Sequence, residues 1–257
     1  MKDFTLCRYR ELCLAILENY QTTTVFDFLS SPGDCISIIR HDVDKKPKNS
    51  LAMAKLESEL GIQSTYYFRT NPDVFDLSII EKIHNLGHEI GYHYEVLDKA
   101  RGDPVRAIQL FEQELKMFPN PVKTICMHGN PLSPWDNRDL WKKYDFRDFG
   151  VIGEAYLSID FRNILYFSDT GRTWQNTYSV KDFTNSPTEQ QSTVHTTIDL
   201  TKLCRNTRDN ICLVTHPQRW NDNYFPWISE LVFQTGKNVG KTMIKNIRGR
   251  RKRHENP

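Results

Sequence analysis

The sequence predicts an α/β protein built as a single distorted or incomplete (β/α) barrel of about seven strands. Two observations indicate this fold: short β-rich apolar segments alternate with helical segments along most of the chain, and no Ser-, Gly- or Pro-rich linker divides it. Alternating strands and helices form right-handed βαβ units around a parallel sheet. The 257 residues suffice for one such barrel, which commonly needs about 200–250 residues.

The expected elements follow one another in regular order. Apolar residues spaced three and four apart predict a helix over 6–20, and the apolar run 35–40 predicts the first strand. Pro47 suits the first turn of a helix that ends at Gly61, and the helix over 77–87 also ends at a glycine. Further strands are expected over 64–69, 88–95, 123–127, 163–167 and 210–215, and further helices over 103–118, 136–144, 199–206 and 225–248.

Two segments depart from this alternation. Residues 168–195 are rich in Thr, Ser and Gln, and we expect a long loop there that could serve as a lid over a site. Residues 237–257 contain eight Lys or Arg and one Glu, so we expect a domain over 1–236 followed by a basic, frayed tail. The tail is a candidate for peripheral contact with a membrane or an assembly. The acidic remainder of the chain argues against a nucleic-acid partner.

The composition predicts a protein of the cytoplasm. The mean hydropathy is −0.58, and no apolar run approaches the roughly 20 residues that span a membrane. The first residues do not resemble a signal peptide. The six cysteines form no Cys-x-x-Cys pair, so we expect reduced and mostly buried thiols.

Polar clusters stand at the ends of five predicted strands, and the carboxyl ends of barrel strands share one rim. Asp42 and Asp44 are two apart on an extended segment and can project to one side. With His93 and His128 they offer ligands for Zn²⁺ or a similar ion. A carboxylate beside such a metal can accept a proton from water, and His216 can protonate a leaving group. The layout is typical of a metal-dependent hydrolase. The five clusters are HDVD (41–44), GYHYE (91–95), HGNP (128–131), SDTGR (168–172) and HPQRW (216–220).

Four of the motifs carry a resemblance to a known family. RHDVD (40–44), STYYF (64–68), LGHEIGYHYE (86–95) and THPQRW (215–220) resemble motifs of the polysaccharide deacetylase family, the metal-dependent deacetylases of NodB homology. The similarity covers about residues 35–220 and is greatest to a divergent branch with RHDVD and GHEIGYHYE signatures, which is often associated with surface-polysaccharide synthesis. The resemblance implies a distorted (β/α) barrel that removes acetyl groups from amino sugars with a divalent metal, for which zinc is expected.

The resemblance also implies roles for single residues. Asp42 matches the catalytic base and His216 the general acid, whereas Asp44 and His93 match metal ligands. Leu97 stands where the family has its second metal histidine, so the third ligand must come from elsewhere. The candidates are, in order, His128, His88, Glu95 and His41, although His88 is more readily interpreted as a core histidine.

Substrate contacts are expected from polar and aromatic residues near these clusters, because aromatic faces stack on sugar rings. Asp169 and Arg172 are open to a second interpretation as a surface ion pair. The expected activity is removal of an acetyl group from an N-acetylated sugar or a surface-polysaccharide precursor. Two alternatives stay open: an amidase or deformylase of a small metabolite, and a weakly active or inactive sugar-binding protein. The expected substrate-binding residues are Tyr94, Glu95, Asn130, Asp169, Arg172 and Trp220.

Overall fold

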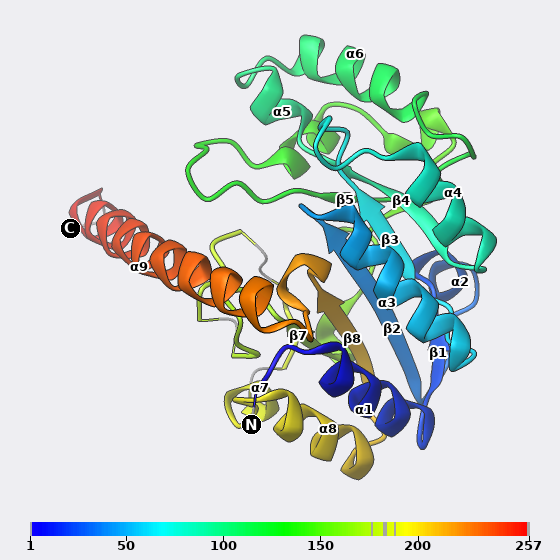
Figure 1. Ribbon diagram of the computed structural model, residues 1–257. Coiled ribbons are helices and arrows are strands. Elements are labelled where there is room, and N and C mark those ends of the chain that lie inside the picture. The colour runs from blue at the N-terminus through cyan, green and yellow to red at the C-terminus, as the bar shows by residue number, and fades with distance from the viewer. Residues whose placement is uncertain (1, 176, 182–183, 188, 256–257) are drawn as a thin grey trace.

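The computed structural model describes residues 2–175, 177–181, 184–187 and 189–255. A curled, all-parallel sheet forms a half-barrel with helices packed around it (Figure 1). The predicted α/β fold with an incomplete (β/α) barrel is therefore confirmed. The strands are β1 (Gln21–Thr23), β2 (Ile36–Val43), β3 (Thr65–Phe68), β4 (Glu89–Tyr94), β5 (Thr124–Met127), β6 (Gly153–Glu154), β7 (Ile164–Ser168) and β8 (Asn210–Thr215).

The order of the strands explains why the barrel is incomplete. Along the sheet it is β6-β5-β4-β3-β2-β8-β7, and β1 pairs with the start of β2. Because β8 lies beside β2, the strands from β2 to β8 follow chain order around a curve, as in a closed barrel. In the described part of the chain no ladder joins β6 to β7, so the curve stays open there. The sequence analysis missed β1 and β6, whose three and two residues are too short to show a pattern.

The helices mostly begin and end where the sequence predicts. Asp76 and Asp103 cap α4 and α6 through their side chains, and Pro47 opens α3. The predicted helix over 136–144 is instead a 3₁₀ helix, η1. In the described ranges no helix is long and apolar enough to cross a membrane. The helices are α1 (Leu6–Leu17), α2 (Val25–Ser30), α3 (Pro47–Glu59), α4 (Leu77–Asn85), α5 (Val96–Lys99), α6 (Pro104–Leu115), α7 (Glu189–Ser192), α8 (Thr197–Asn206) and α9 (Tyr224–Glu255), with 3₁₀ helices η1 (Asn137–Lys142), η2 (Phe146–Phe149), η3 (Phe161–Asn163) and η4 (Pro217–Arg219).

Alternate residues of each strand face the inside and the outside of the half-barrel. The inner side carries a hydrophobic cluster that includes Ile38 of β2 and Tyr67 of β3. The outer side packs on the helices through residues such as Ile39 and Tyr66. This alternation decides which side chains near the rim can reach a common site.

Gly91 of β4 is required by the packing inside the half-barrel. A Cβ atom there would lie 2.3 Å from the ring of Tyr67 and 2.9 Å from the carbonyl oxygen of Thr124. The Tyr67 hydroxyl is hydrogen-bonded to the Thr124 side chain at 2.8 Å, so the ring is fixed against the sheet. Glycine therefore lets a tyrosine fill the interior two residues before His93.

A buried carboxylate ties the outer layer to the sheet. Glu57 of α3 accepts hydrogen bonds from the hydroxyls of Tyr9, Ser64 and Tyr66. It also lies 2.8 Å from His41 Nε2. Burial disfavours the charged form, but His41 and the hydroxyl donors hold the pKa of Glu57 at about 2, so the carboxylate stays ionised.

The structure adds detail to two expectations, the basic tail and the loop over 168–195. Helix α9 runs without interruption through positions 236 and 237, so the expected tail begins inside a helix and its backbone is helical up to Glu255. Of the described residues in the loop after β7, Thr170 alone lines the site described below, whereas the described part of α9 contributes six lining residues. Among the described residues, α9 therefore covers the site more extensively than the loop in which a lid was expected. The six cysteines are free thiols, as expected, and four are buried.

Candidate metal centre

A cavity of about 470 Å³ opens at the carboxyl ends of β2, β4, β5 and β8. The prediction that side chains from separate strand ends would converge on one rim is confirmed. Their approach follows from the parallel sheet, in which all strands end at the same edge. The predicted residues that line the cavity together are Asp42, Asp44, His93, His128 and His216.

The register of the strands sets the level of each side chain. His93 of β4 is paired with Cys126 of β5, and the backbone N–H of His128 donates to the carbonyl of Tyr94 at 2.8 Å. His128 comes two residues after Cys126, just as Asp44 comes two residues after Asp42. His128 and Asp44 are therefore placed to project toward the inner side of the half-barrel, near the level of His93.

Three ligand atoms converge at this level. Asp44 Oδ1 lies 3.1 Å from His128 Nδ1 and 3.5 Å from His93 Nε2, and the two histidine nitrogens are 3.3 Å apart. A tetrahedral ion bound at about 2.0–2.1 Å requires ligand atoms separated by about 3.3 Å. Asp44 Oδ1 is buried and accepts no hydrogen bond in the described part of the chain. The three residues therefore fit an ion of the size of Zn²⁺, with a further position left for water or substrate.

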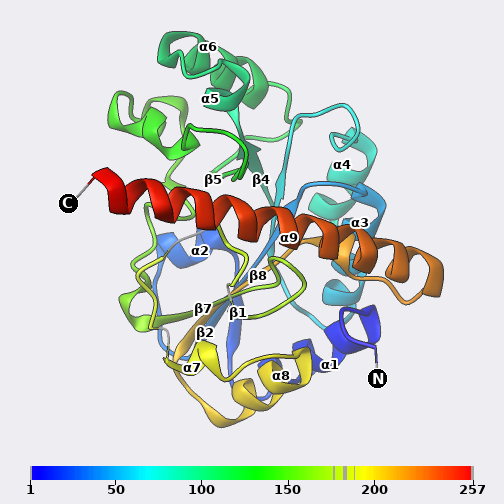
Figure 2. The same ribbon diagram turned by 90° about the vertical axis from the view of Figure 1, so that its left-hand side faces the viewer.

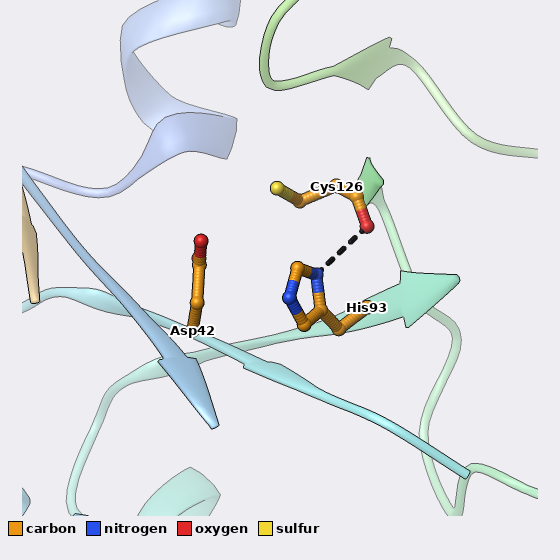
Figure 3. Close-up of side chains that lie close together, drawn as sticks. All are labelled: Asp42, His93 and Cys126. Atoms are coloured by element: carbon orange, nitrogen blue, oxygen red, sulfur yellow. Dashed lines mark hydrogen bonds between the residues drawn. The ribbon is translucent and has the colours of Figure 1, made fainter. Parts of the chain in front are cut away.

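The orientation of His93 is fixed by its other nitrogen. Nδ1 donates to the backbone carbonyl of Cys126 at 3.0 Å, the contact drawn as a dashed line in Figure 3. This hydrogen bond leaves Nε2 without a proton in the neutral ring, which is the form that binds metal. Nε2 is also the atom that faces Asp44 and His128.

A second group of potential ligands shares His93. Asp42, His93 and Cys126 offer ligand atoms within 4.8 Å of one another (Figure 3). All three are buried, and Cys126 does not line the cavity. His93 Nδ1 is already used by the backbone carbonyl, and Asp42 Oδ2 is held by Arg40. The group formed by Asp44, His93 and His128 is more accessible and has its donor atoms available.

The charges of the site are mutually stabilising. Burial disfavours the Asp44 carboxylate, but His128 and His93 hold its pKa well below the ordinary value. Burial works against the charged form of His93 too, yet Asp42 and Asp44 raise its pKa. The Asp44 carboxylate thus remains ionised beside the two imidazoles.

Asp42 lies beside the proposed ligands but is held differently. Arg40 Nη2 donates to Asp42 Oδ2 at 3.2 Å and to the Tyr156 hydroxyl at 2.7 Å. The other oxygen, Oδ1, has no hydrogen-bond partner among the described residues. Arg40 therefore orients the carboxylate and leaves one oxygen available for a proton.

His216 stands across Asp44 from the two ligand histidines. Its Nδ1 donates to Asp169 Oδ1 at 2.6 Å, and Asp169 also accepts from the Trp220 indole at 2.8 Å and from Arg219. Burial would raise the pKa of Asp169, but Arg219 and His216 hold it at about 2. An ionised Asp169 fixes the His216 ring so that Nε2 lies 3.9 Å from Asp44 Oδ2.

The other candidates for the third ligand lie elsewhere. His41 is bonded to Glu57 and Thr215 on the outer side of β2, and His88 is a core histidine bonded to the Ala54 carbonyl, as expected. Glu95 accepts three hydrogen bonds from Arg69 and does not line the cavity. Leu97 packs in the hydrophobic core.

Among the expected substrate-binding residues, only Asn130 lines the cavity. Tyr94 follows His93 on the same strand and therefore faces the opposite side, where its hydroxyl accepts from the Trp141 indole. Trp220 and Asp169 are buried behind His216. Three of the residues expected to contact substrate thus have other partners inside the protein, and two further residues lie outside the cavity wall. These two are Glu95, paired with Arg69, and Arg172, which donates to the Arg219 carbonyl and lies against Phe4 and Trp227.

Several cavity residues escaped the sequence analysis. Gln218 reaches Asp44 Oδ2 with its Nε2 at 3.5 Å, and its Oε1 is buried without a partner in the described part of the chain. The motif HPQRW already contained this residue, and its position two after His216 was a usable signal. The α9 residues gave only helical spacing as a signal. The missed wall residues include Lys45, Arg69, Met127, Leu132, Gln218, Arg219, Glu230, Phe233, Gln234, Lys237, Gly240 and Lys241.

Comparisons with known proteins leave the family of this chain open. A scan against protein-family models gave no match, and a search of curated proteins gave no significant similarity. The resemblance to the polysaccharide deacetylases therefore depends on the short motifs quoted above, and the functional argument depends on the site.

Proposed function

We propose that this protein is a metal-dependent hydrolase that removes the acetyl group from an N-acetylated sugar or a surface-polysaccharide precursor. Asp44, His93 and His128 would hold the divalent ion. The observation that supports the proposal most is the spacing of their ligand atoms, 3.1, 3.3 and 3.5 Å, which matches the edges of a tetrahedral site. The motif resemblance supports an N-acetylated sugar as the substrate.

A bound divalent ion would supply Lewis acidity, which activates water and polarises the amide carbonyl. Asp42 acts as the general base, because Arg40 orients its carboxylate and its Oδ1 has no other partner in the described chain. His216 acts as the general acid and gives its Nε2 proton to the departing nitrogen. The C–N bond breaks as water adds to the carbonyl carbon, and the products are acetate and a free amine. Each proton transfer contributes about 10²–10⁴ in rate.

Asp169 is a positioning residue in this scheme. It is buried and anionic, and its Oδ1 accepts from His216 Nδ1. The opposite nitrogen, Nε2, consequently presents its proton toward the cavity when the ring is charged. Trp220 and Arg219 hold the Asp169 carboxylate in turn.

Metal analysis combined with acetate release tests the proposal. The purified protein should contain close to one zinc or similar ion per chain, and His93→Ala and His128→Ala should lose it. Asp42→Asn should retain the ion yet release acetate from N-acetylated sugars at least about 10²-fold more slowly. His84→Ala is the matched control, because His84 is an exposed histidine of α4 outside the site.

Specific outcomes would overturn the proposal. If the protein as purified and after loading with zinc binds no ion, the centre is assigned wrongly. If it binds the ion and N-acetylated sugars but releases no acetate, the protein is a sugar-binding protein. Release of formate from N-formyl sugars in preference to acetate would instead favour a deformylase.

A further inference from the structure

The wall of the cavity opposite the strand ends is formed by one face of α9. Its lining residues recur at intervals of three and four, as the exposed face of a helix requires. Figure 2 shows α9 running across the front of the half-barrel, over the sheet. A molecule bound at the metal centre would therefore lie between the strand ends and this helix. The α9 residues in the wall are Glu230, Phe233, Gln234, Lys237, Gly240 and Lys241.

Among the described residues that line this space, cations outnumber carboxylates. Arg69 is paired with Glu95 and Arg219 with Asp169, two carboxylates that do not line the cavity. A divalent ion at the centre would add further positive charge. The cavity is lined by the cations Lys45, Arg69, Arg219, Lys237 and Lys241 and by the carboxylates Asp42, Asp44 and Glu230.

Lys45 and Lys237 both line the cavity and lie against the same aromatic ring. Their ammonium nitrogens lie 4.9 Å and 4.6 Å from the centre of the same Phe233 ring. Within the described ranges neither forms an ion pair, whereas the adjacent Lys46 pairs with Glu230. The ring attracts both ammonium groups and so holds two like charges near one another.

Two ammonium groups that line one cavity and lie near one aromatic ring suit a doubly charged ligand. Lys45 follows the proposed ligand Asp44 in the chain, and Lys237 belongs to the helix that covers the same cavity. An anion between them would relieve their repulsion and could extend to the metal centre. A neutral sugar would leave the two charges unopposed.

We propose that the substrate carries a phosphate or diphosphate group, which binds between Lys45 and Lys237 while its acetamido group lies at the centre formed by Asp44, His93 and His128. This inference names the substrate class and rests on the proposed function for the position of the acetamido group, but not for the binding of the phosphate. Gln218 Oε1, buried at the cavity without a partner in the described chain, would accept a hydrogen bond from a sugar hydroxyl or the amide N–H. The phosphate could come from a sugar phosphate, a nucleotide sugar or a lipid-linked sugar.

Calorimetry with N-acetylglucosamine 1-phosphate and with neutral N-acetylglucosamine tests the phosphate site. The phosphorylated sugar should bind the metal-loaded protein more tightly, and Lys45→Ala and Lys237→Ala should each weaken it by about tenfold while leaving the neutral sugar unaffected. Lys48→Ala is the matched control, because Lys48 is an exposed lysine of the same segment outside the cavity. Unchanged melting temperatures would show that the variants remain folded.

A UDP-linked N-acetyl sugar and vesicles carrying a prenyl-diphosphate-linked N-acetyl sugar then distinguish the sources. Preference for either in a manner that depends on the two lysines supports the proposal and identifies the carrier. Equal binding of the phosphorylated and neutral sugars overturns it. So does a phosphate preference that survives in the Lys45→Ala/Lys237→Ala variant but disappears in His128→Ala, because the phosphate would then bind the metal. Lysine-dependent binding without acetate release would refute only the proposed function.

Discussion

Separate substitution of His128 and Cys126 decides which ligand group around His93 holds the ion. One group has only nitrogen and oxygen donors, from Asp44, His93 and His128, whereas the other adds the sulfur of Cys126. We expect His128→Ala to lose the metal and Cys126→Ala to keep it. The reason is that His93 Nε2 lies 3.3 Å from His128 Nδ1, whereas its Nδ1 is occupied by the Cys126 carbonyl.

The structure also predicts the bond lengths. Edges of 3.1, 3.3 and 3.5 Å correspond to a central ion about 2.0 Å from each donor in a tetrahedral arrangement. X-ray absorption of the zinc-loaded protein should therefore show a single shell of nitrogen and oxygen at about 2.0 Å. A cysteine ligand would add sulfur at about 2.3 Å. Loss of a residue that only hydrogen-bonds to a metal ligand commonly costs about 10–100-fold in metal affinity. Loss of the ligand His128 should therefore cost at least about 100-fold, measured in competition with a chelator.

The reasoning has a clear contrary result. Sulfur at about 2.3 Å, together with loss of metal in Cys126→Ala, would place the ion between Asp42, His93 and Cys126 instead. Circular dichroism and melting temperature establish that each variant is folded, and His84→Ala again controls for removal of an exposed histidine.

Three further predictions concern positioning, packing and pH. Asp169→Asn should lower kcat by about 10²-fold or more with unchanged metal content, because His216 loses its ionised partner; unchanged kcat would exclude His216 as the acid. Gly91→Ala should lower the free energy of unfolding measured in urea by about 1–3 kcal/mol. Gly236→Ala should raise it by about 0.5–1 kcal/mol, because a Cβ atom there has no neighbour within 4 Å. Equal effects of the two substitutions would contradict the packing argument. The folded-state pKa of Glu57, about 2, lies below the ordinary 4.5. Ionised Glu57 therefore contributes roughly 3 kcal/mol to the free energy of unfolding above pH 4.5, and this contribution is lost as the pH falls toward 2. Urea unfolding at different pH values measures how steeply the free energy of unfolding falls between pH 4.5 and 2. Glu57→Gln should make this dependence on pH less steep, and an unchanged dependence would show that Glu57 does not cause it.

The fold could be predicted because short local patterns in the sequence mark most of its helices and strands. Apolar runs, glycine stops and side-chain caps recur along the chain, and each marks an element by itself. The strands β1 and β6 were missed because they contain three and two residues and are defined by their neighbours in the sheet. The opening between β6 and β7 likewise depends on tertiary pairing, which no local pattern reports.

The site could be predicted only where strand geometry determines it. Polar residues at the ends of parallel strands had to meet, and this rule identified Asp44, His93 and His128 as neighbours. Nearness in the sequence was a poor guide to substrate contacts, because Tyr94 lies next to His93 yet points to the other side of the sheet. Trp220 does not line the cavity for a different reason: it is buried, and its indole N–H donates a hydrogen bond to Asp169.

The α9 wall could not be predicted, because it depends on where a distant helix packs. Residues 237 onward looked like a tail on charge alone, and their charge pattern does not reveal that Lys237 approaches Phe233 and Lys45. Because α9 lies over the cavity, Lys237 belongs to the cavity wall and not to a solvated tail. A cation in a solvated tail needs no partner, whereas one beside a second cation in a cavity wall favours an anion.

The register of β4 and β5 explains how the proposed centre could have three ligands without a histidine at position 97. Leu97 packs in the core, and its backbone N–H is held by Asn137 at 2.9 Å, so the segment after β4 is committed to packing. The pairing of His93 with Cys126 places the residue two positions further along β5 on the same inner side. That residue is His128, and its backbone bond to Tyr94 fixes it there. The third ligand of the proposed centre can thus come from the end of the neighbouring strand, because parallel strands bring both ends to the same rim.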